Sequence, residues 1–245
     1  MAQHPLINAT VFFGQYDISA DHNQVRVGAT VEALDRTTFG QTTRIKMGGL
    51  RDGEITGSGF LSYGATEVEA YLSEKLSLND VPITVTPTGT ALDRAPFMQA
   101  LVASLTPVGG TVGDMHRFDW KGETGQSPLI HTGVLMAAKA ARTSSSNSGT
   151  AQQLGAVGAS QRIWAALHVF AASGTTPSLA VTVKSDNSVG FGSPTTQITF
   201  TSATTATSEV KSTAGAITDD YWRVDWTING GTTPSFTFAV AIGIL

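Results

Sequence analysis

Apolar and polar residues alternate along most of the chain, which predicts a protein built mainly of β-strands. The run Val25, Val27, Ala29, Val31 and Ala33 has the period of two that a half-buried strand requires. The predicted strands cover residues 10–16, 24–34, 52–62, 81–86, 97–106, 113–121, 162–172, 179–184, 195–201, 221–229 and 236–244. Residues 36–49, which are rich in Gly, Thr and charge, are predicted to form a long loop or an extended hairpin tip.

One segment has helical periodicity. Its apolar residues fall on one stripe: Val68, Tyr71, Leu72 and Leu76. Thr66 and Glu69 have the spacing of a capping box at the start of a helix. We therefore expect a single helix that packs against a sheet through its apolar stripe.

The segment 122–128 has two glycines and a proline in seven residues and predicts a domain boundary. We expect two β-sandwich or barrel-like domains, at residues 1–125 and 126–245, the first with one flanking α-helix. The second should be an antiparallel sandwich of jelly-roll or galactose-binding-like type. Its near-identical segments 174–178 and 231–235 predict two β-hairpins, and residues 143–150 predict a mobile loop.

Composition narrows the classes of function. The chain has no cysteine, which excludes disulfides, thiol nucleophiles and cysteine-based metal sites. A net charge of −4 without a basic cluster disfavours tight binding of nucleic acid. No run reaches the roughly 18 apolar residues of a membrane span, and the first 14 residues lack the pattern of a signal peptide. We expect a protein that is soluble when made and does not bind a membrane.

The usual catalytic motifs are absent from the sequence. Asp114 and His116 share a strand face, but Asp119 points the other way, which disfavours a metal site or a catalytic triad. His168 alternates with two apolar neighbours and is expected to face solvent or an interface. We therefore predict no enzyme activity, no cofactor and no metal.

Trp222 and Trp226 have the same parity in one predicted strand and should share a face. Two interpretations stay open for this pair. The indoles pack in the core of the sandwich, or they form an exposed face on which sugar rings stack.

Three short motifs in the first half carry a resemblance to a known family. They are Tyr-Asp-Ile-Ser at 16–19, Leu-Asp-Arg-Thr-Thr-Phe-Gly at 34–40, and Gly-Leu-Arg-Asp-Gly at 49–53, which leads into the strand 54–60. Residues 10–62 resemble the N-terminal segment of the major tail (tail tube) proteins of siphophages. The chain departs from the family pattern at Ala20, where glycine is usual, and at Arg36, where valine is usual.

The resemblance implies a structural virion protein of a phage tail, made in the host cytoplasm. Its subunits would join strands into an inner β-barrel, as hexameric or trimeric rings that stack into a tube. DNA would pass through the lumen without specific binding, and other tail proteins would be partners. The segment 36–49 would reach the next ring.

The assembly interface implied by these motifs consists of Asp17, Asp35, Thr37, Thr38, Phe39, Gly40, Leu50 and Asp52. Other roles stay open beside the tail tube. They are a head decoration or fibre-associated protein of the virion, and a carbohydrate-binding module.

Overall fold

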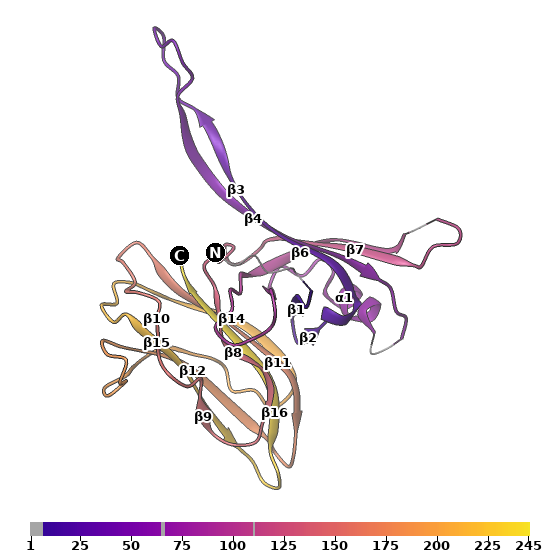
Figure 1. The fold of residues 1–245 in the computed structure, drawn as a ribbon, viewed down its shortest axis with the longest axis vertical. Helices are drawn as coiled ribbons and strands as arrows, with labels where there is room; N and C mark the ends of the chain where they lie inside the picture. Colours follow the sequence, from indigo (N-terminus) through magenta and orange to yellow (C-terminus); the bar gives the residue numbers. More distant parts are fainter. Residues whose placement is uncertain (1–6, 65–66, 110) are drawn as a thin grey trace. The chain divides into compact units, whose positions relative to one another are not determined.

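The computed structural model describes residues 7–64, 67–109 and 111–245 and is mainly β, as the alternation predicted (Figure 1). The first half contains β1 (Thr10–Phe13), β2 (Tyr16–Asp17), β3 (His22–Asp35), β4 (Lys46–Phe60), α1 (Val68–Lys75), β5 (Val81–Thr86), β6 (Phe97–Gly109) and β7 (Arg117–Thr124). The second half contains β8 (Val134–Arg142), β9 (Ser146–Asn147), β10 (Gln152–Gln153), β11 (Arg162–Ser173), β12 (Ser178–Asp186), β13 (Thr195–Thr199), β14 (Thr207–Ala214), β15 (Tyr221–Asn229) and β16 (Ser235–Ile244).

The strands form three sheets. The first has the order β2-β1-β5-β6-β7-β4-β3, and all its strands precede residue 126. The other two have the orders β10-β15-β12-β13, with β9 also paired to β15, and β14-β11-β16-β8. All strands of these two sheets follow residue 126.

Spatial contacts group the chain differently, into two compact units. The sandwich unit comprises the chain through residue 21, residues 81–98 and residues 130–245. The arm unit comprises residues 22–80 and 99–129. Strands β1, β2 and β5 thus belong with the second half in space. Independent folding of 1–125 and 126–245 stays a prediction.

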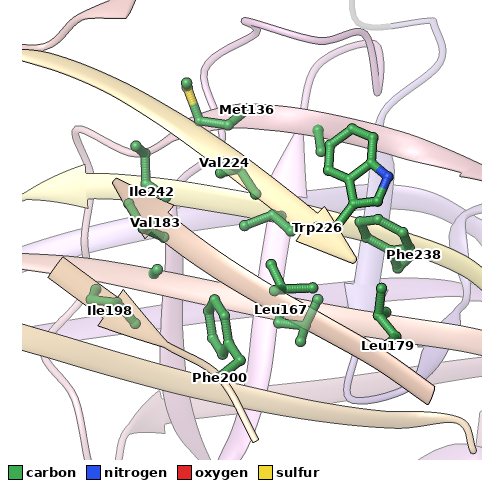
Figure 2. Close-up of a cluster of buried hydrophobic side chains, with 14 of the residues drawn as sticks. Met136, Leu167, Leu179, Val183, Ile198, Phe200, Val224, Trp226, Phe238 and Ile242 are labelled. Atoms are coloured by element: carbon green, nitrogen blue, oxygen red, sulfur yellow. The ribbon is translucent and has the colours of Figure 1, made fainter. Parts of the chain in front are cut away.

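The core of the sandwich unit lies between its five-stranded and four-stranded sheets (Figure 2). Leu167 of β11 and Phe238 of β16 meet Val183 of β12 and Val224 of β15 there. Each such side chain contributes about 1.5–3 kcal/mol when it is buried. The alternation of the sequence therefore matches the inner faces of both sheets.

The two predicted hairpins of this unit are wrong. β11 and β12 belong to different sheets, as do β15 and β16, so the repeated segments are crossovers. Because β11 pairs with β16 and β12 with β15, the crossovers lie together. The N–H of Gly231 donates to the carbonyl of Thr175 at 2.7 Å, and Thr176 and Thr233 share a left-handed φ of 47°.

His168 is fully buried, contrary to the expected exposure. It does face away from its two neighbours, but β1 and β5 cover that side of β11 and form a second core with Phe12 and Ala166. Its Nδ1 donates to the carbonyl of Gly14 at 2.7 Å, so Nε2 accepts from the hydroxyl of Thr84 at 2.8 Å. Both ring nitrogens are satisfied in the neutral form.

Burial lowers the pKa of His168 to about 4, although the bond to Gly14 and the charge of Asp17 oppose the shift. The folded state then binds fewer protons than the unfolded state, whose imidazole titrates near 6.5. Neutral His168 therefore contributes to the free energy of unfolding. We expect this contribution to be complete above pH 6.5 and to fall by about 3 kcal/mol as the pH decreases to 4. Urea unfolding at several pH values would measure it. In a His168→Gln variant, this part of the dependence of the free energy of unfolding on pH should be absent. An equal dependence on pH in the two proteins would contradict the low pKa given to His168.

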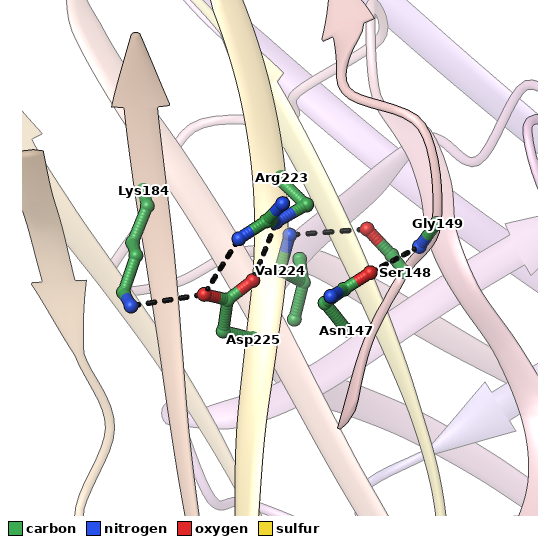
Figure 3. A network of polar contacts seen from close by, with 7 residues as sticks. All are labelled: Asn147, Ser148, Gly149, Lys184, Arg223, Val224 and Asp225. Carbon is green, nitrogen blue, oxygen red and sulfur yellow. Dashed lines mark hydrogen bonds and ion pairs between the residues drawn. The ribbon is translucent and has the colours of Figure 1, made fainter. Parts of the chain in front are cut away.

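A polar network lies on β15 beside the segment 143–150, which itself pairs with β15 (Figure 3). Asp225 accepts from Arg223 at 2.7 Å and pairs with Lys184 at 2.9 Å. Burial favours a higher pKa for Asp225, but the hydrogen bonds and charges of these two partners outweigh it and lower the pKa. Next to them, the Ser148 hydroxyl accepts from the N–H of Val224 at 3.1 Å. The expected mobile loop therefore contains the short strand β9.

The predicted helix is present as α1. It buries Val68 and Leu72, whereas Leu76 lies beyond its last residue and is exposed. The residue before the helix, Glu67, makes no capping bond through its side chain. The proposed cap Thr66 lies outside the described residues.

Candidate assembly surface

Strands β3 and β4 continue as a hairpin beyond the rest of their sheet. β4 pairs with β7 only from Glu54 to Phe60, whereas its pairing with β3 extends to Lys46 opposite Asp35. Residues 29–53, here called the arm, therefore form a two-stranded hairpin without a further strand beside it in the described chain. Figure 1 shows the arm projecting from the other strands of the arm unit. Of the two forms expected for residues 36–49, a long loop or an extended hairpin tip, the structure has the hairpin tip, because β4 begins at Lys46.

The residues of the tail-like motif shape the tip of the arm. Asp35 accepts from the N–H of Thr37 at 2.9 Å, and the Thr37 hydroxyl accepts from the N–H of Ile45 at 3.0 Å. Hydrogen bonds from the side chain and backbone of Thr37 lower the pKa of Asp35. Gly40 has a φ of +87°, which favours glycine, and the carbonyl of Thr38 accepts a 3.3 Å bond across the turn. The tip is thus a defined turn.

Large apolar side chains of the arm are exposed. Phe39 is fully exposed at the tip, and Leu50 is 81% exposed on β4. The other exposed apolar residues of the arm are Val31, Leu34, Ile45 and Met47. An isolated two-stranded hairpin is marginally stable in water, and contiguous apolar surface marks interaction sites. The arm is therefore a surface that favours a partner.

The arm carries four cations against three carboxylates, those of Glu32, Asp35 and Asp52, and its cations are concentrated in one stretch. Residues 36–51 contain four cationic side chains and no acidic one: Arg36, Arg44, Lys46 and Arg51. All four are exposed, and none forms an ion pair within the described residues. Composition alone predicted no basic cluster. The hairpin brings Arg36 beside the stretch 44–51, which carries the other three cations, and it also places Asp35 opposite Lys46.

Asp17 belongs to the sandwich unit and not to the arm. It is on β2 of the sandwich unit, where it pairs with Lys139 at 2.6 Å and accepts from the N–H of Ser19 at 3.1 Å. The remaining predicted residues lie on the arm, with Asp52 at its base accepting from the N–H of Gly53 at 2.8 Å. Asp17 thus has a role within its own chain, and the assembly role of each residue stays a prediction.

Trp222 and Trp226 do not form an exposed aromatic face. Trp222 is fully buried and Trp226 is 8% exposed, both in the core of the sandwich unit. Their indole N–H groups donate to the carbonyls of Gly155 at 2.8 Å and Ser144 at 3.2 Å. The core interpretation is confirmed, and neither ring offers a face to a sugar.

The sheet has an open edge at β3 and a partly free side along β6, whose other neighbour in the sheet is β5. β3 pairs with β4 on one side only. On the outer side of β6, the last backbone bonds join Val102 to Ser77 at 3.0 Å and to Leu78 at 2.9 Å. The next residues of β6 are mostly exposed as far as Pro107, which lacks an N–H. β3 and the part of β6 beyond Val102 thus present unpaired backbone groups within the described chain.

The described ranges, 7–64, 67–109 and 111–245, bear on metal binding and on membrane spans. There, no three His, Asp or Glu side chains lie close enough to hold a metal ion. The same ranges contain no helix with the length and apolar character needed to cross a membrane.

Comparisons with known proteins identify no family. No family model matches the chain, and no curated protein matches it. A protein of the native gene transfer agent virion is 15% identical, with 52% of this chain and 98% of that chain covered at a TM-score of 0.40. The Dit protein of phage SPP1 is 14% identical, with 97% and 99% covered at 0.38. A protein of the extended sheath–tube complex of an extracellular contractile injection system is 20% identical, with 49% and 85% covered at 0.38. Similarity at this level assigns neither a family nor a function.

Proposed function

We propose that the chain is a structural virion protein that forms the tail tube of a tailed phage by stacking homo-oligomeric rings. The observation that carries the proposal is the arm, a defined hairpin whose apolar and basic side chains nothing in the described chain covers. The motifs that resemble siphophage tail tube proteins fall on this hairpin, mainly at residues 34–40 and 49–53. Other tail proteins are its partners at the ends of the tube.

The ring forms by pairing of sheet edges between copies. The arm unit has the strand order β6-β7-β4-β3, and each neighbouring pair is antiparallel. β3 and β6 therefore run in opposite directions. The β3 edge of one copy can thus continue, as another antiparallel pair, onto the part of β6 beyond Val102 in the next copy, where neither β5 nor residues 77–78 pair with it. This contact joins two different surfaces of the protein. Such head-to-tail contacts close into a ring when the rotation between neighbouring copies brings the last copy back to the first. The resemblance implies six copies in a ring if each chain carries one tube-type domain.

The polar face of this sheet lines the lumen and lets DNA pass. Lys121 of β7 is paired with Glu123 at 2.8 Å and with Glu54 at 3.4 Å. The hydrogen bond and charge of Glu123 raise the pKa of Lys121, with a smaller effect from Glu54. A cation that is already paired has little attraction for phosphate, so this face supports passage of DNA without specific binding.

Electron microscopy of the purified protein tests the proposal. We expect rings and stacked tubes in negative stain, and a ring mass of six chains by light scattering. A DNA-binding assay at physiological salt should show no stable complex with double-stranded DNA. A protein that stays monomeric at every concentration would overturn the proposal, and rings that never stack would exclude the tube.

A further inference from the structure

A pocket of about 610 Å³ lies in the sandwich unit, between an edge of each of its two sheets. One wall is the segment 92–94, which extends the β8 edge: the N–H of Leu92 donates to the carbonyl of Leu135 at 2.7 Å. The opposite wall includes β10, the last strand of the five-stranded sheet. Sites for small ligands commonly have volumes of about 300–1,000 Å³, so this pocket has room for one.

Arg94 is the one charged side chain in the lining that the structure describes. Its Nη1 donates to the carbonyl of Thr132 at 3.3 Å, which holds the guanidinium at the pocket wall. Three carboxylates are near it in the chain or in the fold, those of Asp93, Asp220 and the chain end at Leu245. None of them forms an ion pair with Arg94 within the described residues. The pocket therefore offers an uncompensated positive charge to an anionic group.

Three glutamines line the pocket, and each is fixed by one end of its amide. The amide nitrogen of Gln152 donates to a backbone carbonyl at 2.9 Å, and that of Gln153 donates to Asp220 at 2.6 Å. Gln161 is held the other way, because its oxygen accepts from the N–H of Gly158 at 2.9 Å. Two amide oxygens and one amide nitrogen thus stay available within the described chain. Such a set of acceptors and donors matches the alternating N–H and carbonyl groups of a peptide backbone.

The apolar part of the lining includes a residue with a strained backbone. Leu92 has a φ of 72°, in the left-handed region that favours glycine, and its side chain is 49% exposed. Beside it in the lining are Val134, Leu154 and Ile244, which pack against the sandwich core. Strain of this kind is concentrated at sites that bind ligands, because the surrounding structure must impose it. The pocket therefore joins one cation to a rigid aliphatic surface.

We propose that this pocket binds an extended segment of another protein in which an acidic residue stands next to an aliphatic one. The carboxylate pairs with Arg94, and the aliphatic side chain packs on Leu92 and Leu154. The backbone of the segment lies along the open edge of β10 and bonds to the glutamines. This binding is separate from the proposed tube function and does not depend on it.

The lining favours a peptide over the other polymers that a virion protein meets. Sugar rings stack on aromatic faces, and within the described chain no aromatic side chain lines the pocket. Nucleic acids are held by several cations at once, whereas this lining has one. A peptide uses the cation, the amides and the aliphatic surface together.

A peptide array probed with the labelled full-length protein tests the proposal. The array holds pentapeptides, capped at both ends, in which Asp or Glu stands next to Leu, Ile or Val, together with the same peptides carrying Asn or Gln in place of the acid. We expect the acidic peptides to bind about tenfold more strongly, because a hydrogen bond between charged partners is stronger than a neutral one. Equal binding of acidic and amide peptides, or no binding of any, would overturn the proposal. Binding of neutral oligosaccharides on a glycan array, without binding of peptides, would assign the pocket to sugars instead.

Removal of the cation tests the role of the pocket in this binding. Arg94→Gln should weaken the acidic peptides about tenfold and leave their amide counterparts unchanged. The matched control is Lys211→Gln, which removes the same charge from β14, outside the pocket lining. Equal losses in the two variants would show a general effect of net charge and would overturn the site.

Replacement of the strained leucine separates binding from folding. In Leu92→Gly the backbone adopts a φ of 72° without strain, so we expect little change in the melting temperature. Peptide binding should nevertheless fall, because the aliphatic wall is lost. A large decrease in the melting temperature with unchanged binding would show that Leu92 serves the fold alone and would contradict the proposal.

Discussion

Replacing Phe39 with aspartate is expected to abolish tube growth and to leave the monomer folded. Phe39 is fully exposed and has no place in either core, so its loss removes no packing. In a tube, its ring would be buried against the next copy, and burying a charge there without a partner costs several kcal/mol. Negative-stain microscopy should show no tubes, and circular dichroism should show an unchanged melting temperature.

A matched control separates the arm from a general effect of added charge. Val189 is 53% exposed and lies in the sandwich unit, outside the arm. The Val189→Asp variant should therefore assemble as the parent does. Normal tubes from Phe39→Asp would contradict the role given to the arm, and a lower melting temperature would show that Phe39 supports the monomer.

The local patterns of the sequence predicted most strands. A strand that buries one face alternates apolar and polar residues with a period of two. β5, β15 and β16 appear close to their expected bounds. β14 was missed because its residues, such as Glu209 and Lys211, are mostly polar and it lies at the edge of its sheet. A polar edge strand takes its structure from the neighbouring strand β11, and its own sequence does not signal it.

Features that depend on the packing of distant segments were predicted less well. His168 was expected at a surface because nothing in its own strand indicates that β1 and β5 cover it. The repeated turns were interpreted as hairpins because a turn motif does not specify which sheet the next strand joins. The arm combines both cases. Its motif and its four cations were visible in the sequence, but how far β3 and β4 stay paired, with Asp35 opposite Lys46, was not.

Replacing Trp222 with alanine is expected to destabilise the sandwich unit by about 3–5 kcal/mol. The indole is fully buried, and its N–H donates to the carbonyl of Gly155 at 2.8 Å. The substitution therefore leaves a large cavity and removes the donor of a buried carbonyl. Urea unfolding, followed by circular dichroism, would measure the loss.

Tyr221 provides the control for this prediction because it precedes Trp222 on β15, is half-buried and lies outside the core. Tyr221→Ala should cost clearly less, since its ring leaves a smaller cavity. The comparison also separates the two interpretations of the tryptophans. If Trp222 served a glycan surface, its replacement would abolish sugar binding and leave the free energy of unfolding unchanged. Burial instead predicts a loss of stability that is independent of any added sugar, because the ring stabilises the contact between the two sheets of the sandwich.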